Sequence, residues 1–269
     1  MNYNKTIIIM ILAVFSLPSF GSDMAKEKRW ADQIVDSIIV GEPVWLKANK
    51  DKFLGIYTEN EAENSRGAAI ILHGLGVHPN WPDVVLPIRS ELPAHGWATL
   101  SLQMPVLGND AEFSEYQPLF KEVPGRINAG IAYLKQQGYS NVVLIGHSLG
   151  AKMAVSYTAK PSNNIAALVT IGLSASDNSS TGALTMIENT KQPVLDLYGS
   201  QDLDAVISTA KARKAAARKG KNNQYRQTKI DGANHFFVGA EEDLVRSVKS
   251  WLSKYSGKTV KPGATIPQQ

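Results

Sequence analysis

The chain has 269 residues, a formal net charge of +4 and 43% hydrophobic residues. This length suits one large globular domain, and the composition excludes an intrinsically disordered chain. The absence of cysteine excludes structural disulfides, thiolate metal sites, a cysteine nucleophile and lipid attachment through a cysteine. The charge is too mild to indicate a nucleic-acid-binding protein by itself.

The N-terminus has the features of a secretory signal peptide. Lys5 supplies a short positive region, and residues 7–15 form an apolar core. The small residues Ser19 and Gly21 stand at positions −3 and −1 and predict cleavage after Gly21. An uncleaved membrane anchor is the alternative, although the apolar run is short for a membrane span. We therefore expect a signal peptide over residues 1–21 and an exported protein, periplasmic in a bacterium with two membranes and otherwise secreted.

The pattern of apolar residues that follows predicts alternating strands and helices. Residues 24–38 have helical spacing, and residues 43–48 and 52–59 predict an antiparallel hairpin. Further strands are predicted at 68–73, 97–103, 141–146, 167–172, 194–199 and 224–230, and helices at 83–95, 122–137, 149–159, 204–219 and 240–254. This order predicts an eight-stranded, mostly parallel, doubly wound sheet with helices on both faces.

Residues 142–150, VVLIGHSLG, form the most informative segment of the chain. An aliphatic strand ends at a Gly-x-Ser-x-Gly turn, and a helix rich in small residues follows. Such a turn holds Ser148 in a strained conformation above the sheet, at a helix N-terminus, where it can act as a nucleophile. Gly146 and Gly150 avoid the collisions that a Cβ would make there. A glycine-rich turn with an ordinary serine is the alternative, which the strand–turn–helix context disfavours.

A serine nucleophile needs a base and an acid, which in this type of fold follow in the order serine, acid, histidine. Of the five histidines, His235 alone follows Ser148. Asp202 lies between them in a G-x-x-D pattern just beyond the seventh strand, and Asp204 is the alternative acid. Asp196 lies inside that strand and is expected to be structural. We predict that His235 accepts the proton of Ser148 and that Asp202 orients the imidazole.

Residues 67–76 form another apolar strand, which ends in an H-G-x-G turn. Enzymes of this kind place an oxyanion donor in such a turn, so the backbone N–H groups of Leu75 and Leu149 are predicted to form the oxyanion hole. His73 is expected to anchor the turn rather than to catalyse. We expect no organic cofactor and no metal, because this chemistry needs neither.

Together these features resemble the α/β-hydrolase superfamily over nearly the whole chain after residue 21. The serine elbow, the H-G-x-G turn, the acid loop and the late histidine occur in the expected order. Residues 70–107 further resemble an exported bacterial α/β-hydrolase family of unknown function. The resemblance implies an α/β-hydrolase domain over residues 22–256 and its general chemistry, but no substrate. Residues 257–269 are rich in Lys, Pro, Gly and Gln and predict a disordered tail.

Two connections bear on the shape of the site. Only about 20 residues separate the sixth and seventh predicted strands, which leaves no room for a large cap domain. Residues 104–124 form a long connection in which Phe113, Tyr116, Leu119 and Phe120 stand among acidic residues. This connection predicts either a rim over Ser148 or a surface loop with a small core of its own.

The sequence therefore predicts an exported serine hydrolase, most simply a carboxylesterase that acts on short-chain esters, with a small-molecule ester as its partner. Thioesterase and amidase chemistry remain open. The alternative from another class is a non-catalytic α/β-hydrolase scaffold that serves as an envelope binding or assembly factor. The basic segment Lys211–Lys221 predicts the solvated face of a helix, with a weak anionic-surface contact as the alternative. We expect no nucleic-acid partner, and the sequence leaves the oligomeric state open.

Overall fold

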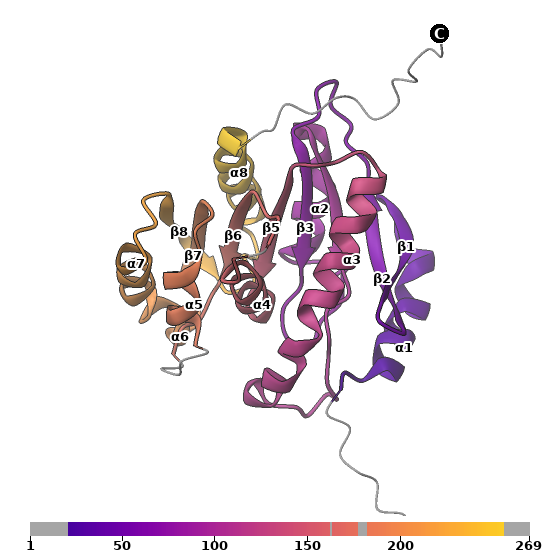
Figure 1. The fold of residues 1–269 in the computed structure, drawn as a ribbon, viewed down its shortest axis with the longest axis horizontal. Helices are drawn as coiled ribbons and strands as arrows, with labels where there is room; N and C mark the ends of the chain where they lie inside the picture. Colours follow the sequence, from indigo (N-terminus) through magenta and orange to yellow (C-terminus); the bar gives the residue numbers. More distant parts are fainter. Residues whose placement is uncertain (1–20, 162, 177–181, 256–269) are drawn as a thin grey trace, which may run out of the picture.

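The computed structural model describes residues 21–161, 163–176 and 182–255. One eight-stranded sheet runs through them in the order β1-β2-β4-β3-β5-β6-β7-β8 (Figure 1). β2 is antiparallel to both β1 and β4, and all other neighbouring strands are parallel. The strands are β1 (Glu42–Ala48), β2 (Asp51–Thr58), β3 (Gly67–Leu72), β4 (Trp97–Leu102), β5 (Val142–His147), β6 (Ala167–Ile171), β7 (Val194–Gln201) and β8 (Tyr225–Asn234).

Helices cover both faces of the sheet (Figure 1). α3, α4, α5 and α7 pack on one face, whereas α2 and α8 pack on the other. Successive strand residues point to opposite faces, so Ile70 and Leu144 enter the first core and Ile71 and Ile145 enter the second. The helices are α1 (Met24–Ile34), α2 (Val85–Glu91), α3 (Val123–Gln136), α4 (Leu149–Thr158), α5 (Ala183–Asn189), α6 (Asp204–Ile207), α7 (Ala210–Lys219) and α8 (Glu241–Leu252).

The doubly wound sheet that the sequence predicts is confirmed. Every residue of β3, β4, β5 and β6 is buried, which explains their nearly continuous apolar sequences. The predicted hairpin also forms, with Ala48 paired to Asp51 across a turn. Asn49 occupies the left-handed region there, with φ of 54°, a conformation that asparagine tolerates better than most residues.

Several elements differ from their predicted bounds, and the helix expected over 24–38 ends at Ile34. The helix expected over 83–95 is the shorter α2 followed by a 3₁₀ turn, because Pro93 has no N–H to continue the helical hydrogen bonds. The helix expected over 204–219 is divided into α6 and α7. Ser208 and Thr209 lie at the break, and their hydroxyls donate to backbone carbonyls one turn earlier, at 2.6 Å each. β8 extends four residues beyond its predicted end, to Asn234.

The connection between β6 and β7 contains one seven-residue helix, α5, within residues 172–176 and 182–193. No large cap domain is present in this described part, as the sequence predicts. Among the described residues, none of the helices is both long enough and apolar enough to cross a membrane. Residues 1–20 of the predicted signal peptide and the predicted tail lie outside the described residues.

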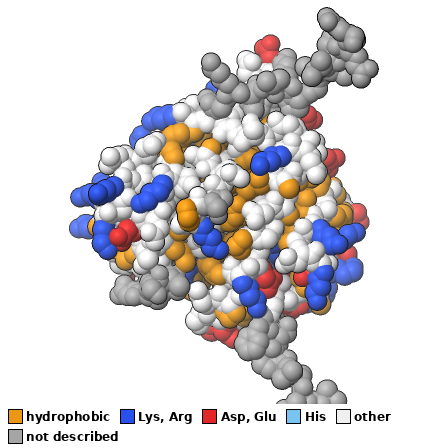
Figure 2. Space-filling view, viewed as in Figure 1, with side chains coloured by type: hydrophobic (Ala, Val, Ile, Leu, Met, Phe, Trp, Pro, Cys, Tyr) orange, Lys and Arg blue, Asp and Glu red, His pale blue; other side chains and the backbone are white. Residues whose placement is uncertain are grey.

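The basic segment Lys211–Lys221 was predicted to form a solvated helix face, and one of its basic residues is buried instead. Lysine and arginine side chains gather at the edge of the molecule where α7 lies (Figure 2). Arg213 is the exception, since it is fully buried and its Nε donates to Asp196 at 2.8 Å. The charge available to an anionic surface is therefore smaller than the sequence suggests. The basic residues of this segment that remain exposed are Lys211, Lys214, Arg218, Lys219 and Lys221.

The parallel topology gathers the polar turns of the chain at one edge of the sheet. β3, β5, β6 and β7 are parallel neighbours or near neighbours, so their carboxyl ends meet on the same side. In open α/β sheets this edge is where ligands bind. The residues that follow these strands are His73, Ser148, Gly172 and Asp202.

Candidate active site

Ser148 occupies a strained turn between β5 and α4. Its φ of 55° and ψ of −118° lie in a region that non-glycine residues rarely adopt. Close backbone contacts maintain this turn. A Cβ on Gly146 would lie 2.4 Å from the carbonyl oxygen of Gly150, and a Cβ on Gly150 would lie 2.4 Å from that of His73. Both glycines are therefore required by the close approach of the neighbouring backbone, as expected for a nucleophile elbow.

The structure brings Ser148, His235 and Asp202 into one hydrogen-bonded chain. His235 Nε2 lies 3.0 Å from Ser148 Oγ, and His235 Nδ1 lies 2.5 Å from Asp202 Oδ1. Because a carboxylate only accepts, Nδ1 carries the proton and Nε2 is free to accept the serine proton. His235 and Asp202 are buried, whereas Ser148 is partly exposed. The serine hydroxyl thus has a base on one side and access to solvent on the other.

Asp202 is held as a charged acceptor. Its carboxylate accepts the backbone N–H of Leu203 at 2.8 Å and that of Gly199 at 3.3 Å. Burial alone would raise the pKa of Asp202, but the hydrogen bond and charge of His235, together with these amides, lower it below its usual value. Asp204, the alternative acid, is exposed and is the first residue of α6. Leu203, rather than Asp204, occupies the N-cap position of that helix.

The H-G-x-G turn lies directly beside the elbow. A Cβ on Gly74 would lie 3.3 Å from His147 Nδ1 and 3.4 Å from the Cβ of Ser148, so the turn approaches the elbow closely. His73 anchors the turn, as predicted. Its Nδ1 donates to the carbonyl of Gly74 at 2.8 Å, and its Nε2 accepts the N–H of Met104 at 2.9 Å. Complete burial lowers the pKa of His73 to about 3, so the ring is neutral and joins the ends of β3 and β4.

The two predicted oxyanion donors belong to the elbow and to the H-G-x-G turn beside it. Leu149 is the first residue of α4, where backbone N–H groups have no partner within the helix. Leu75 follows Gly74 in the turn beside the elbow and is 36% exposed.

Two further residues support His235, and sequence reasoning missed both. His147 Nε2 donates to the carbonyl oxygen of His235 at 2.9 Å, and burial together with the charge of His235 lowers the pKa of His147 to about 4. Gly172 has φ of 61°, and a Cβ there would lie 2.9 Å from His235 Cε1. The glycine at the end of a buried strand was the available signal for Gly172. Nothing local indicates the role of His147, because its partner is 88 residues away.

Ser148 and His235 line an open pocket of about 270 Å³. Phe113, from the 3₁₀ segment Phe113–Lys121, lies at its rim. The predicted rim over Ser148 is therefore confirmed in part. Tyr116 and Leu119 belong to the main core rather than to a small core of their own. The other lining residues are Lys152, Gly172, Ser174, Ser176, Leu203, Ala205 and Val206.

Lys152 gives this pocket a cationic element. Its side chain is buried one turn after Ser148 on α4, with Nζ 5.2 Å from the centre of the Phe113 ring and 5.8 Å from that of Phe120. Larger surface hollows, of about 690 and 520 Å³, lie elsewhere and are lined by neither Ser148 nor His235. We therefore locate the site by its side chains rather than by its size.

Comparison with known proteins gives a family and a fold. Residues 25–118 and 114–254 match the model of a family described as "Protein of unknown function (DUF3530)". The chain belongs to this family. A comparison of this chain with curated protein sequences found no match.

Several solved structures share the fold. Est1E from Butyrivibrio proteoclasticus with bound ferulic acid has 18% identity and a TM-score of 0.63, covering 79% of this chain and 98% of its own. The dienelactone hydrolase from Anabaena variabilis has 21% identity and a TM-score of 0.63, covering 80% and 97%. The esterase Pf2001 from Pyrococcus furiosus has 16% identity and a TM-score of 0.66, covering 80% and 90%. At these identities the likeness establishes the α/β-hydrolase fold.

Proposed function

We propose that the protein is an exported serine hydrolase that cleaves carboxylic esters. The observation that carries the proposal is the hydrogen-bonded chain from Ser148 through His235 to Asp202, positioned at a strained elbow. A strained serine hydroxyl beside a histidine base that a buried carboxylate orients is the arrangement by which serine enzymes carry out acyl transfer.

The reaction proceeds in two halves. Ser148 Oγ attacks the acyl carbon while His235 Nε2 takes its proton, and the backbone N–H groups of Leu75 and Leu149 stabilise the oxyanion. The tetrahedral intermediate then collapses, and His235 returns the proton to the leaving alcohol. In the second half, His235 deprotonates a water molecule that attacks the acyl-enzyme, which releases the carboxylic acid and restores Ser148. Asp202 stabilises the imidazolium in both halves.

The names of several structures that share the fold favour an ester over an amide or thioester substrate. Pf2001 is named as an esterase, the Anabaena protein is named as a dienelactone hydrolase, and Est1E holds ferulic acid. The open pocket also suits a small ester, because its 270 Å³ lies just below the usual range for ligand sites. A non-catalytic scaffold would share the fold but would not need a base within hydrogen-bond reach of Ser148.

Covalent labelling distinguishes the enzyme from the scaffold. A fluorophosphonate probe should label the wild-type protein on Ser148 and should not label Ser148→Ala. Hydrolysis of p-nitrophenyl acetate should fall by at least about 10⁴-fold in the same variant, because only oxyanion stabilisation and binding remain. Absence of labelling in the folded wild-type protein would favour the scaffold.

The proposed location outside the cytoplasm is supported by the sequence of residues 1–21. N-terminal sequencing of the native protein should give Ser22 as the first residue. An intact Met1 on protein from the cytoplasm would contradict export.

A further inference from the structure

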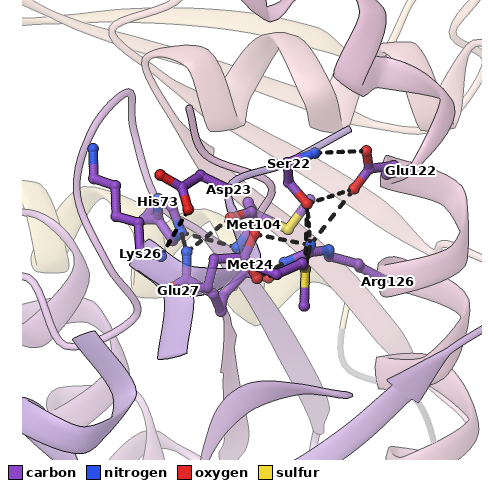
Figure 3. A network of polar contacts seen from close by, with 10 residues as sticks. Ser22, Asp23, Met24, Lys26, Glu27, His73, Met104, Glu122 and Arg126 are labelled. Carbon is purple, nitrogen blue, oxygen red and sulfur yellow. Dashed lines mark hydrogen bonds and ion pairs between the residues drawn. The ribbon is translucent and has the colours of Figure 1, made fainter. Parts of the chain in front are cut away.

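We propose that Glu122 and Arg126 form a binding site for the new amino terminus that cleavage after Gly21 creates at Ser22. The backbone nitrogen of Ser22 donates to Glu122 Oε1 at 3.1 Å, and its hydroxyl donates to Oε2 of the same carboxylate at 2.9 Å. Arg126 Nη2 donates to the Ser22 hydroxyl at 3.2 Å (Figure 3). Both hydrogen-bond donors of the residue that follows the predicted cleavage point thus contact one carboxylate.

The charges around Ser22 favour an ammonium at this position. Glu27 and Glu122 place two carboxylates around the single guanidinium of Arg126, at 2.8 and 3.6 Å. An amide N–H offers one neutral donor, whereas an ammonium offers three donors and the missing positive charge. Hydrolysis of the Gly21–Ser22 bond by an export-associated protease adds water, leaves a carboxylate on Gly21, and leaves on Ser22 an amine that takes up a proton.

The segment after Ser22 is fixed by contacts to distant parts of the chain, so the position of the new terminus is fixed too. The N–H of Asp23 donates to the carbonyl of Val106 at 2.7 Å, and Lys26 Nζ donates to that of Leu107 at 2.8 Å. Glu27 accepts two hydrogen bonds from Arg126, at 2.8 and 2.9 Å, in a buried pair. A chain that begins one residue earlier would carry its ammonium up to about 3.6 Å away from this site.

The site also adjoins the backbone that holds the H-G-x-G turn. Arg126 Nη1 donates to the carbonyl of Gln103 at 2.9 Å, and the next residue, Met104, donates to His73 (Figure 3). The amino terminus therefore stabilises the layer of structure behind the elbow. The titratable and charged groups that surround it come from α1, α3 and the N-cap residues of both helices, and they are Asp23, Lys26, Glu27, Glu122 and Arg126.

Two chains that differ by one residue test the proposal. A fusion cleaved so that the protein begins at Ser22 is compared with one that begins at Gly21, because both carry a positive amino terminus. At pH 7 the Ser22 form should melt about 2–4 °C higher, as expected for one added ion pair in a domain of this size. Glu122→Gln should remove the difference, whereas Glu91→Gln, an exposed carboxyl on α2, should leave it unchanged.

The pH dependence identifies the ammonium itself. The carboxylate raises the pKa of the amino group above the usual value of about 8, so the stabilisation should be present below pH 8 and lost as the pH rises through the raised pKa. The pH dependence of amino-terminal labelling should show the raised pKa in the Ser22 form, and a normal value in Glu122→Gln. Equal melting temperatures for the two chains at pH 7, or a native protein that begins elsewhere, would overturn the proposal. If Glu122→Gln does not fold, the comparison of the two wild-type chains still decides.

Discussion

Asp196 and Asp202 are six residues apart, the first inside β7 and the second just beyond its carboxyl end. The first has a structural role, whereas the second belongs to the candidate active site. Asp196 lies in the middle of the strand and is fully buried. Its Oδ2 accepts hydrogen bonds from Arg213 at 2.8 Å, Tyr225 at 2.5 Å and Gln227 at 2.8 Å. All of these donors come from α7 and β8, so the carboxylate fastens these elements to the sheet.

Asp202, just beyond the same strand, instead accepts two backbone N–H groups and the imidazole of His235. That imidazole faces a pocket, and its other nitrogen faces Ser148. The difference follows from position along the strand. A carboxylate in the middle of a buried strand meets only neighbouring elements, whereas one at the carboxyl end can orient a group that faces a ligand.

Of the two aspartates, Asp202 at the strand end should have the larger effect on activity when it is replaced. Asp202→Asn should lower kcat for p-nitrophenyl acetate by about 10³–10⁴-fold, because the amide no longer selects the imidazole tautomer that accepts the serine proton. Asp204→Asn should change kcat by less than a few fold, since Asp204 is exposed at the start of α6. A larger loss in Asp204→Asn than in Asp202→Asn would transfer the role of the acid to Asp204.

Breaking the acid in the middle of the strand should instead reduce stability. Asp196→Asn leaves the guanidinium of Arg213 buried without its charge partner, and such changes cost about 3–5 kcal/mol. Urea unfolding should show the loss, whereas kcat per folded molecule should remain within a few fold of wild type. Tyr225→Phe is the matched control, because it removes one donor and leaves the ion pair in place. A kcat for Asp196→Asn as low as that for Asp202→Asn would show that the two tasks are not separate.

Features that depend on nearby residues could be predicted from the sequence, whereas contacts between distant segments could not. The apolar strands and the glycines of the elbow impose their structure locally, so the sheet and the position of Ser148 could be predicted. The order of the residues in the chain selected His235, and the position of Asp202 just beyond a strand favoured it over Asp204 as the acid. The hydrogen bond from His147 to the carbonyl oxygen of His235 joins two segments that come together only in the folded protein. The pairing of Arg213 with Asp196 likewise could not be read from an alanine-rich basic helix.

Buried histidines on the site side of the sheet should make the fold sensitive to acid. Burial lowers the pKa of His73 to about 3 and that of His147 to about 4, below the value of about 6.5 in an unfolded chain. The unfolded chain then takes up protons first, so stability is full above pH 6.5 and is lost as the pH falls towards these native values. At pH 5 each ring should contribute a loss of about 2 kcal/mol relative to pH 7.5.

Nuclear magnetic resonance and urea unfolding can test this acid sensitivity together. The ring protons of His73 and His147 should show no titration between pH 7.5 and pH 5, while the free energy of unfolding declines over that range. His95→Gln, a change at a ring that bonds Lys249 on the surface, should leave the decline unchanged. Titration of either buried ring near pH 6.5 would contradict the assignment of neutral, structural imidazoles.

The smallest expected effect is the change of kcat/KM with the length of the acyl chain. It tests the pocket that Ser148 and His235 line. Burying one methylene is worth about 0.8 kcal/mol, so kcat/KM rises with chain length only while each added methylene leaves water. The pocket of about 270 Å³ is open, and Phe113 lies at its rim. We therefore expect kcat/KM for p-nitrophenyl esters to reach a plateau or fall beyond about four to six acyl carbons.

Phe113→Ala sharpens this last prediction, because Phe113 is 45% exposed and contributes apolar surface at the rim. The substitution should lower kcat/KM for butyrate more than for acetate, since only the longer chain reaches the rim. Leu75→Ala is a matched control, as it removes another partly exposed apolar side chain but keeps the backbone N–H that the mechanism uses. A steady rise of kcat/KM through decanoate and laurate would show that Phe113 and its neighbours form a longer apolar trough. The substrate class would then be long-chain lipids rather than small esters.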